Sequence, residues 1–152
     1  MTREQIISEL KAYFSINEIV CNHTFTAFGE SSWQFLDSEL LHTLLVIRRD
    51  ILKVPLTAND YANGISQRGL RCNLCELVRT KTNNNQIYLS AHCNGAGVDL
   101  IPDGMTAENA RAIIASHKDL LPYPIRLETG CSWIHVDTYD YCNGNKINYF
   151  EG

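Results

Sequence analysis

Two histidines and one aspartate in this chain have the side-chain types and spacing of a catalytic zinc site. His92 and Asp99 lie within residues 90–99, and His135 lies within residues 133–137. Two imidazoles and one carboxylate supply three ligands, and a zinc ion with three protein ligands keeps a fourth position open for water. That open position distinguishes a catalytic zinc ion from a structural one, so these residues are the first candidates for chemistry.

The surrounding pattern predicts the elements that must position these residues. Seven positions separate His92 from Asp99, which is too far for one helical turn to hold both, so a loop that runs into a strand is expected. Gly95 and Gly97 permit tight turning and close backbone approach between the two ligands. Residues 98–101 predict the strand that orients Asp99, and strands hold ligands more precisely than loops do.

A second strand is expected to bring His135 beside Asp99. Residues 125–128 and 133–137 predict a pair of strands joined by a short turn, and the coarse pattern makes them neighbours of the strand that carries Asp99. The residues alone leave a structural alternative open, in which His92 hydrogen-bonds within a turn, Asp99 caps a turn and His135 is a core histidine.

The rest of the chain predicts a single α+β domain over residues 1–152, in which N-terminal helices pack on a small, mostly antiparallel sheet that carries the zinc site. Residues 21–36 are expected to be irregular, and residues 60–85 are expected to form a long loop, a kind of segment that is often functional. Capping residues and apolar spacing predict the remaining elements. These are helices over residues 3–13 and 14–20, from Asp37 to Lys53 and after Thr106, and a strand over residues 56–59.

Length and charge narrow the class of protein. The chain has 152 residues, enough for one domain that buries about 70% of its unfolded surface. Its net charge of −4, with scattered Lys and Arg, argues against nucleic acid as the main partner. No apolar run is long enough to predict a signal peptide or a transmembrane span. The chain is therefore expected to be made in the cytoplasm and to stay there until something else releases it.

Six cysteines could suggest a disulfide scaffold, but the length and the missing signal peptide favour reduced thiols. Cys72 and Cys75 form a C-x-x-C pair, which would need two further ligands to make a structural zinc site. No paired spacing points to such ligands, so free loop thiols are expected, and His23 is expected to be structural. The cysteines that could complete a site are Cys93, Cys131 and Cys142.

The motifs resemble those of a known family of zinc peptidases. Residues 90–99, Ser-Ala-His-Cys-Asn-Gly-Ala-Gly-Val-Asp, resemble the S-x-H-x-x-G-x-A-x-D signature of the D-Ala-D-Ala carboxypeptidase and L-alanyl-D-glutamate endopeptidase family. Residues 133–137 resemble its W-x-H element, and residues 14–20 resemble the F-T-x-x-E-F segment of its phage-associated branch. This family acts in bacterial cell-wall metabolism and in phage endolysins, and its fold is related to hedgehog signalling domains. The resemblance covers nearly the whole chain and implies the same fold.

By position, the resemblance makes His92, Asp99 and His135 the zinc ligands. Gly97 is a departure, because the family usually has Ala there. The change is small, since the position serves to leave space. Zn²⁺ is therefore the cofactor that the resemblance implies.

The resemblance also implies a carboxylate shortly before the last histidine ligand, which takes a proton from the zinc-activated water and passes it to the leaving amine. Glu128 is the candidate. Asp137 is the rival, because residues 135 and 137 of a strand face the same side; it could instead orient a ligand histidine. A third alternative makes Glu128 a surface residue that pairs with Arg126.

An arginine is implied as the group that stabilises the oxyanion. Residues 68–73 resemble the family's R-S-x-x-x-N stretch, and Arg68 matches its arginine by position, with Arg71 as the alternative. In relatives this arginine steadies the substrate carbonyl or carboxylate, and a fixed cation aimed at a developing oxyanion suits that role. The structural alternative is a solvated loop arginine.

The activity implied by the resemblance is hydrolysis of an amide bond in the stem peptide of peptidoglycan, by an endopeptidase or a D,D-carboxypeptidase. The protein is then a monomeric phage or prophage lytic enzyme that acts on the cell wall, either after release with the help of a holin or from the virion. Two alternatives remain. One is a non-catalytic, metal-containing binding module of the same fold, and the other is a virion-associated structural protein.

Overall fold

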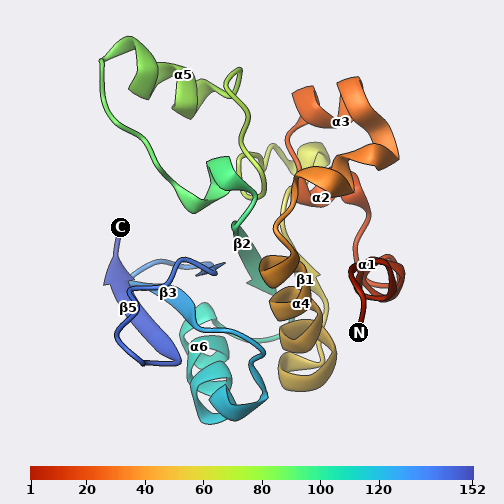
Figure 1. The fold of residues 1–152 in the computed structure, drawn as a ribbon, viewed down its shortest axis with the longest axis vertical. Helices are drawn as coiled ribbons and strands as arrows, with labels where there is room; N and C mark the ends of the chain where they lie inside the picture. The colour runs from red at the N-terminus through yellow and green to blue at the C-terminus, as the bar shows by residue number, and fades with distance from the viewer.

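Five strands form one sheet in the order β1-β2-β4-β3-β5. All neighbouring pairs are antiparallel except β3 and β5, which run parallel. The computed structural model describes the whole chain, residues 1–152 (Figure 1). The strands are β1 (Leu56–Thr57), β2 (Gly97–Pro102), β3 (Ile125–Thr129), β4 (Ile134–Asp137) and β5 (Ile147–Glu151).

Alternation along the strands gives the sheet one apolar face and one polar face. Because successive side chains of a strand point to opposite faces, Val98 and Leu100 of β2 face one way and Asp99 faces the other. In β4, Val136 lies on the apolar face and His135 on the polar face. The apolar face belongs to one continuous core of 29 buried residues, so the chain folds as a single domain.

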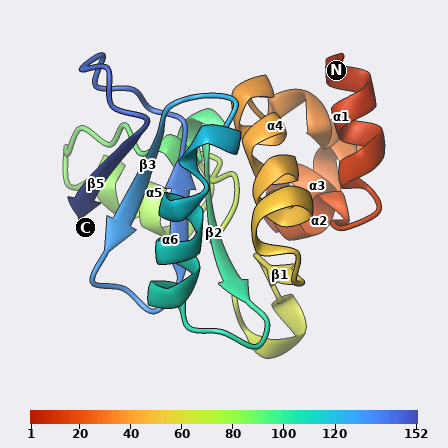
Figure 2. The same ribbon diagram turned by 90° about the horizontal axis from the view of Figure 1, so that it is seen from below.

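Six α-helices accompany the sheet. The helix α6 packs on the apolar face against β2 and β4, and α5 lies on the opposite side of the sheet (Figures 1 and 2). None of the helices is both long enough and apolar enough to cross a membrane. The helices are α1 (Arg3–Leu10), α2 (Ile16–Ile19), α3 (Asn22–Phe28), α4 (Ser38–Val46), α5 (Glu76–Asn83) and α6 (Ala107–Ser116).

Capping starts several helices where the sequence predicts them. Thr2 and Gln5 form a reciprocal capping box at α1, and Glu18 accepts a hydrogen bond from the backbone N–H of Ser15 at α2. The side chain of Thr106 caps α6. These bonds satisfy backbone groups that have no partner inside the helix. The prediction of a single α+β domain with a mostly antiparallel sheet is confirmed.

Two segments contain helices that the sequence pattern did not predict. Residues 21–36, expected to be irregular, form α3 and a 3-10 helix, Gly29–Phe35, and residues 60–85 contain α5. The helix α5 has no buried side chain, so it shows no apolar stripe that would reveal it. Strand β5 was also missed, because only Asn148 in it is buried and its pairing partner β3 is distant in sequence.

Candidate metal centre

Two of the residues expected to bind zinc meet on the polar face of the sheet. Asp99 of β2 and His135 of β4 are direct partners in the antiparallel register, and the side chains of such a pair lie side by side. The pairing of β3 with β4, carried one residue past Leu127, puts Glu128 opposite His135. Glu128 in turn pairs with Phe150 of β5. The expectation that Asp99 and His135 lie on adjoining strands is confirmed.

His92 reaches the same place from a 3-10 turn, Ala91–Asn94, that immediately precedes β2. The hydroxyl of Ser90 accepts a hydrogen bond from the backbone N–H of His92. Gly95 ends the turn with a φ of +66°, and a Cβ there would lie 2.1 Å from the backbone oxygen of Phe35. Only glycine fits that position, so the turn that presents His92 is fixed by packing as well as by backbone conformation.

Gly97, at the start of β2, occupies the position where the resembled family usually has alanine. A Cβ on Gly97 would lie 2.9 Å from the Cβ of Ala91 and 3.2 Å from the Cβ of Asp137. The first separation is too short for two carbon atoms, so an alanine would require the histidine turn to shift. In this chain the missing methyl group lets β2 and the turn lie closer together.

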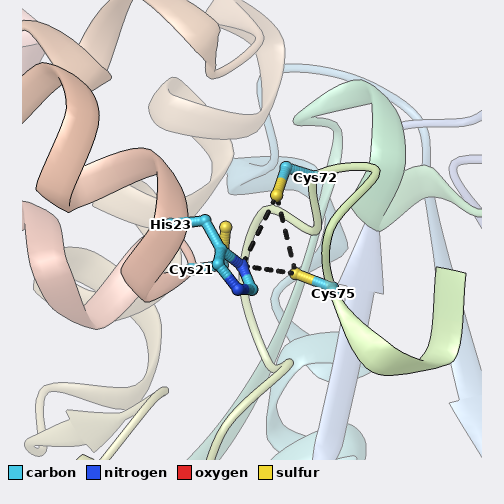
Figure 3. Close-up of side chains that lie close together, drawn as sticks. All are labelled: Cys21, His23, Cys72 and Cys75. Carbon is cyan, nitrogen blue, oxygen red and sulfur yellow. Dashed lines mark hydrogen bonds between the residues drawn. The ribbon is translucent and has the colours of Figure 1, made fainter. Parts of the chain in front are cut away.

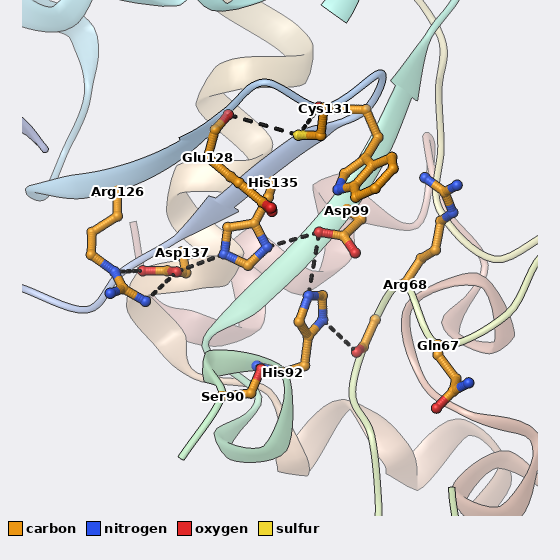
Figure 4. A network of polar contacts seen from close by, with 12 residues as sticks. Gln67, Arg68, Ser90, His92, Asp99, Arg126, Glu128, Cys131, His135 and Asp137 are labelled. Carbon is orange, nitrogen blue, oxygen red and sulfur yellow. Dashed lines mark hydrogen bonds and ion pairs between the residues drawn. The ribbon is translucent and has the colours of Figure 1, made fainter. Parts of the chain in front are cut away.

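The donor atoms of the three residues converge on one point (Figure 4). His135 Nδ1 lies 2.8 Å from Asp99 Oδ1, and His92 Nε2 lies 3.3 Å from the same oxygen. One donor atom from each residue lies within 4.8 Å of the other two. All three residues are largely buried, yet they line a cleft of about 470 Å³. The geometry therefore combines three potential ligands with open space beside them.

The other nitrogen of each histidine is held by a hydrogen-bond acceptor. His92 Nδ1 donates to the backbone oxygen of Gly69 at 2.9 Å, and His135 Nε2 donates to Asp137 Oδ2 at 2.7 Å. In a neutral imidazole only one nitrogen carries a proton, so these bonds leave lone pairs on His92 Nε2 and His135 Nδ1. Both lone pairs face Asp99 Oδ1, which is also a hydrogen-bond acceptor, so the three atoms repel one another. A cation between them would remove this repulsion.

Without a cation, a proton takes its place. Burial alone lowers the pKa of His135, but hydrogen bonds with Asp137 and Asp99 outweigh burial and raise the pKa to about 9. Burial raises the pKa of Asp99, but the hydrogen bonds from His135 and His92 outweigh it and hold that pKa well below its usual range. The site is thus built to keep Asp99 anionic and to attract positive charge.

Asp137 and Glu128, the two carboxylates considered as proton acceptors, have different surroundings. Asp137 is fully buried and forms a bidentate ion pair with Arg126 at 2.9 and 2.8 Å, in addition to its bond with His135. Glu128 lines the cleft, and its carboxylate makes no hydrogen bond or ion pair. Arg126 pairs with Asp137 rather than with Glu128, so Asp137 is positioned to orient His135 and the Glu128 carboxylate has no partner.

The two candidate arginines also differ. Arg71 lines the cleft; its Nη2 lies 3.7 Å from Asp99 Oδ2, and its other nitrogens donate to a backbone oxygen and to the hydroxyl of Tyr88. The guanidinium of Arg68 lies over the indole of Trp133, 5.2 Å from the ring centre, and its Nη1 is buried without a partner. Arg68 is not among the residues that line the cleft, although Trp133 is.

A second group of potential metal ligands lies outside this centre, and the sequence pattern missed half of it. Cys72 and Cys75 are joined by Cys21 and His23, and one ligand atom of each lies within 4.8 Å of the others. Cys93, Cys131 and Cys142, which the sequence offered as further ligands, lie outside this group, whereas His23, expected to be structural, belongs to it. A C-x-H pattern at residues 21–23 was the available signal.

No protein-family model, curated protein or solved structure matches this chain. The case for a function therefore depends on the geometry of the site and on the sequence motifs.

Proposed function

We propose that this protein is a zinc-dependent peptidoglycan peptidase that hydrolyses an amide bond of the stem peptide. The observation that carries the proposal is the convergence of two imidazole lone pairs on the Asp99 carboxylate at the edge of an open cleft. The sequence motifs around His92 and His135 supply the substrate class, because they resemble those of cell-wall peptidases.

The donor set fits zinc. His92 Nε2, Asp99 Oδ1 and His135 Nδ1 are the ligand atoms, and two nitrogens with one carboxylate oxygen match the three-ligand sets of catalytic zinc. A zinc ion held there supplies a Lewis acid for the substrate carbonyl and lowers the pKa of water toward about 7. The hydrogen bonds from the outer nitrogens to Gly69 and Asp137 hold both rings in the orientation that binding requires.

Glu128 acts as the proton carrier in this proposal. Its carboxylate has no competing partner, and on β3 it lies beside His135 of the neighbouring strand β4. It takes a proton from the attacking water and gives it to the amine of the leaving group, so one residue serves as base and then as acid. Asp137 is unsuited to that exchange, because the Arg126 ion pair and the hydrogen bond of His135 favour its charged form and lower its pKa against the effect of burial.

One arginine beside the cleft supplies positive charge for the reacting carbonyl. Arg71 lines the cleft and is held there by its contacts with Asp99 and Tyr88, and a fixed cation at that place suits a developing oxyanion. Arg68 matches the family's arginine by position, but it does not line the cleft, and its unpartnered Nη1 is buried beside Trp133. Arg71 is therefore the residue that we assign to substrate stabilisation.

The bond that is cut is a stem-peptide amide, in an endopeptidase or a D,D-carboxypeptidase reaction. A phage or prophage origin accords with the resemblance of residues 14–20 to the phage-associated branch of the family. Such a lytic enzyme reaches the wall after release, with a holin, or from the virion.

The test is digestion of purified peptidoglycan by the zinc-loaded protein, with the products analysed by mass spectrometry. A new amino terminus is expected with the native protein and not with the His135→Ala variant, and the fragment mass identifies the bond. Zinc bound at the centre without cleavage of any wall type would contradict the peptidase and favour a binding module. Absence of metal from the centre would contradict both.

A further inference from the structure

Four metal-ligating side chains gather outside the His92 centre, between α3 and the turn that leads into α5 (Figure 3). Cys21 and His23 come from the start of α3, and Cys72 and Cys75 come from the turn that leads into α5. Cys21 and Cys75 are buried, Cys72 is partly buried and His23 is exposed. The two pairs are about 50 residues apart in sequence, so the fold alone brings them together.

The separations of the ligand atoms match the edges of a zinc tetrahedron. Bond lengths of about 2.3 Å for Zn–S and about 2.0 Å for Zn–N, at tetrahedral angles, place two sulfurs about 3.8 Å apart and a sulfur about 3.5 Å from a nitrogen. His23 Nδ1 lies 3.6 Å from Cys72 Sγ and 3.8 Å from Cys75 Sγ, and the two sulfurs lie 4.0 Å apart. Cys21 Sγ completes a set in which all four atoms lie within 4.8 Å.

The backbone supports the same arrangement. The turn between Cys72 and Cys75 closes with a hydrogen bond from the backbone N–H of Cys75 to the carbonyl of Cys72, and the N–H of Leu74 points at Cys72 Sγ from 3.4 Å. An N–H aimed at sulfur stabilises a thiolate. On the other side, the N–H of Cys21 donates to the carbonyl of Leu70, which fixes Cys21 against the same loop.

A disulfide or a redox pair explains this cluster less well. All six cysteines are free, and the 4.0 Å between Cys72 and Cys75 sulfurs is about twice the length of a disulfide bond. A dithiol pair also leaves the nearby imidazole and the third thiol without a role. Three sulfurs and one imidazole nitrogen are a complete ligand set for structural zinc.

We propose that Cys21, His23, Cys72 and Cys75 bind a second zinc ion in a closed tetrahedral site with a structural role. Four protein ligands leave no position for water, so this ion does not take part in hydrolysis. The assignment rests on these four residues and stands whether or not the His92 centre is catalytic.

The ion would fix the segment that supports the first centre. The loop that leads into Cys72 carries Gly69 and Arg71. The carbonyl of Gly69 accepts a hydrogen bond from His92, and Arg71 contacts Asp99. A Cβ on Gly69 would lie 1.9 Å from the backbone oxygen of Ile19, so this loop is pressed against α2. A zinc ion bound next to Arg71 would tie this loop to α3 and so keep the contacts of Gly69 with His92 and of Arg71 with Asp99 in place.

The first experiment measures metal and thiol release from the native protein. Titration of the zinc-loaded protein with a mercurial reagent is expected to release one zinc ion per chain as the cluster thiols react. Replacement of zinc by cobalt is expected to give thiolate-to-cobalt charge-transfer absorption in the near ultraviolet. A wild-type protein that shows neither signal would overturn the proposal, and this result needs no variant to fold.

Variants then assign the ion to the cluster. Cys75→Ser is expected to lower the zinc content from two ions per chain to one, to remove the charge-transfer band and to lower Tm. Cys142→Ser is the matched control, because Cys142 is exposed and lies outside the cluster, and it should change none of these. His135→Ala should lose the other zinc and keep the band. A band that survives Cys75→Ser together with unchanged zinc content would contradict the assignment.

Discussion

The two candidate metal sites of this protein are built in opposite ways. The His92–Asp99–His135 centre lies on the face of a sheet, uses nitrogen and oxygen donors, supplies three ligands and borders a cleft. The Cys21–His23–Cys72–Cys75 cluster lies between a helix start and a turn, uses mostly sulfur and supplies four ligands.

The contrast accords with a chemical role proposed for one site and a structural role proposed for the other. At the sheet, strand register sets the ligand positions, and the hydrogen bonds of Gly69 and Asp137 orient the two rings, so the three residues can converge and still leave a position open. At the cluster, the ligands come from segments with few buried side chains. There an ion in a closed site would itself hold the two segments together, which the few buried side chains do not.

The largest effect is expected from His135→Ala, which should abolish metal binding at one site and leave the other site unchanged. Loss of one of three ligands should empty the sheet centre and reduce peptidoglycan hydrolysis to background, while the cluster keeps its zinc. Metal content by mass spectrometry and a digestion assay measure both effects. His117→Ala is the control, because His117 is exposed at the end of α6. Retained hydrolysis in His135→Ala would remove the sheet centre from the mechanism.

Glu128→Gln tests whether the unpaired carboxylate carries the proton. Turnover is expected to fall about 10²–10⁴-fold, the range for loss of a general acid–base group, with zinc content unchanged because Glu128 is not a ligand. Kinetic measurement of kcat on a stem-peptide substrate gives the comparison. Glu108→Gln, at an exposed position of α6, should behave like the native protein. Near-normal turnover would remove Glu128 from the proton-transfer role.

A smaller effect is expected from Asp137→Asn, which weakens the support of one ligand and leaves all ligands present. Loss of a partner of this kind costs about 10–100-fold in metal affinity. Competition with a chelator measures the affinity of the sheet centre, and the cobalt charge-transfer band of the cluster should not change. Asp103→Asn, at an exposed turn, serves as the reference. An unchanged affinity would mean that the sheet holds His135 in place without the Asp137 carboxylate.

The smallest effect is a pH dependence of the metal-free protein. The pKa of His135 is raised to about 9 in the folded state, so its contribution to the free energy of unfolding is complete below its ordinary value near 6.5 and is lost as pH rises through about 9. The Tm of the metal-free protein should therefore fall by several degrees over this window. The metal-free His135→Gln variant should lack the part of this fall in Tm that comes from His135. The thiols of the cluster contribute equally to both proteins, so their contribution cancels in the comparison.

If the two stripped proteins lost stability in parallel over that window, the proton shared by His135, Asp99 and Asp137 would contribute nothing to folding. With zinc bound the dependence should reverse, since zinc requires neutral His135 and binds more tightly as pH rises.

The predicted parts of the fold are those whose signal is local. Thr2, Ser15 and Thr106 mark helix starts because capping involves residues within one turn. The alternation around Asp99 and His135 marks strands because apolar side chains on one face of the sheet pack in the core and polar side chains lie on the other face. The missed helices α3 and α5 bury almost no side chains, so no apolar period was present to reveal them.

Residues close together in the chain were enough to predict the ligand types, the turn glycine Gly95 and the period-two pattern that puts Asp99 and His135 on the face opposite the core. Long-range packing was needed to show which carboxylate is free, because the pairing of Arg126 with Asp137 leaves Glu128 unpartnered. It also decided that Cys21 and His23 join Cys72 and Cys75. Contacts between residues about 50 positions apart depend on how the whole chain packs, and no local pattern encodes them.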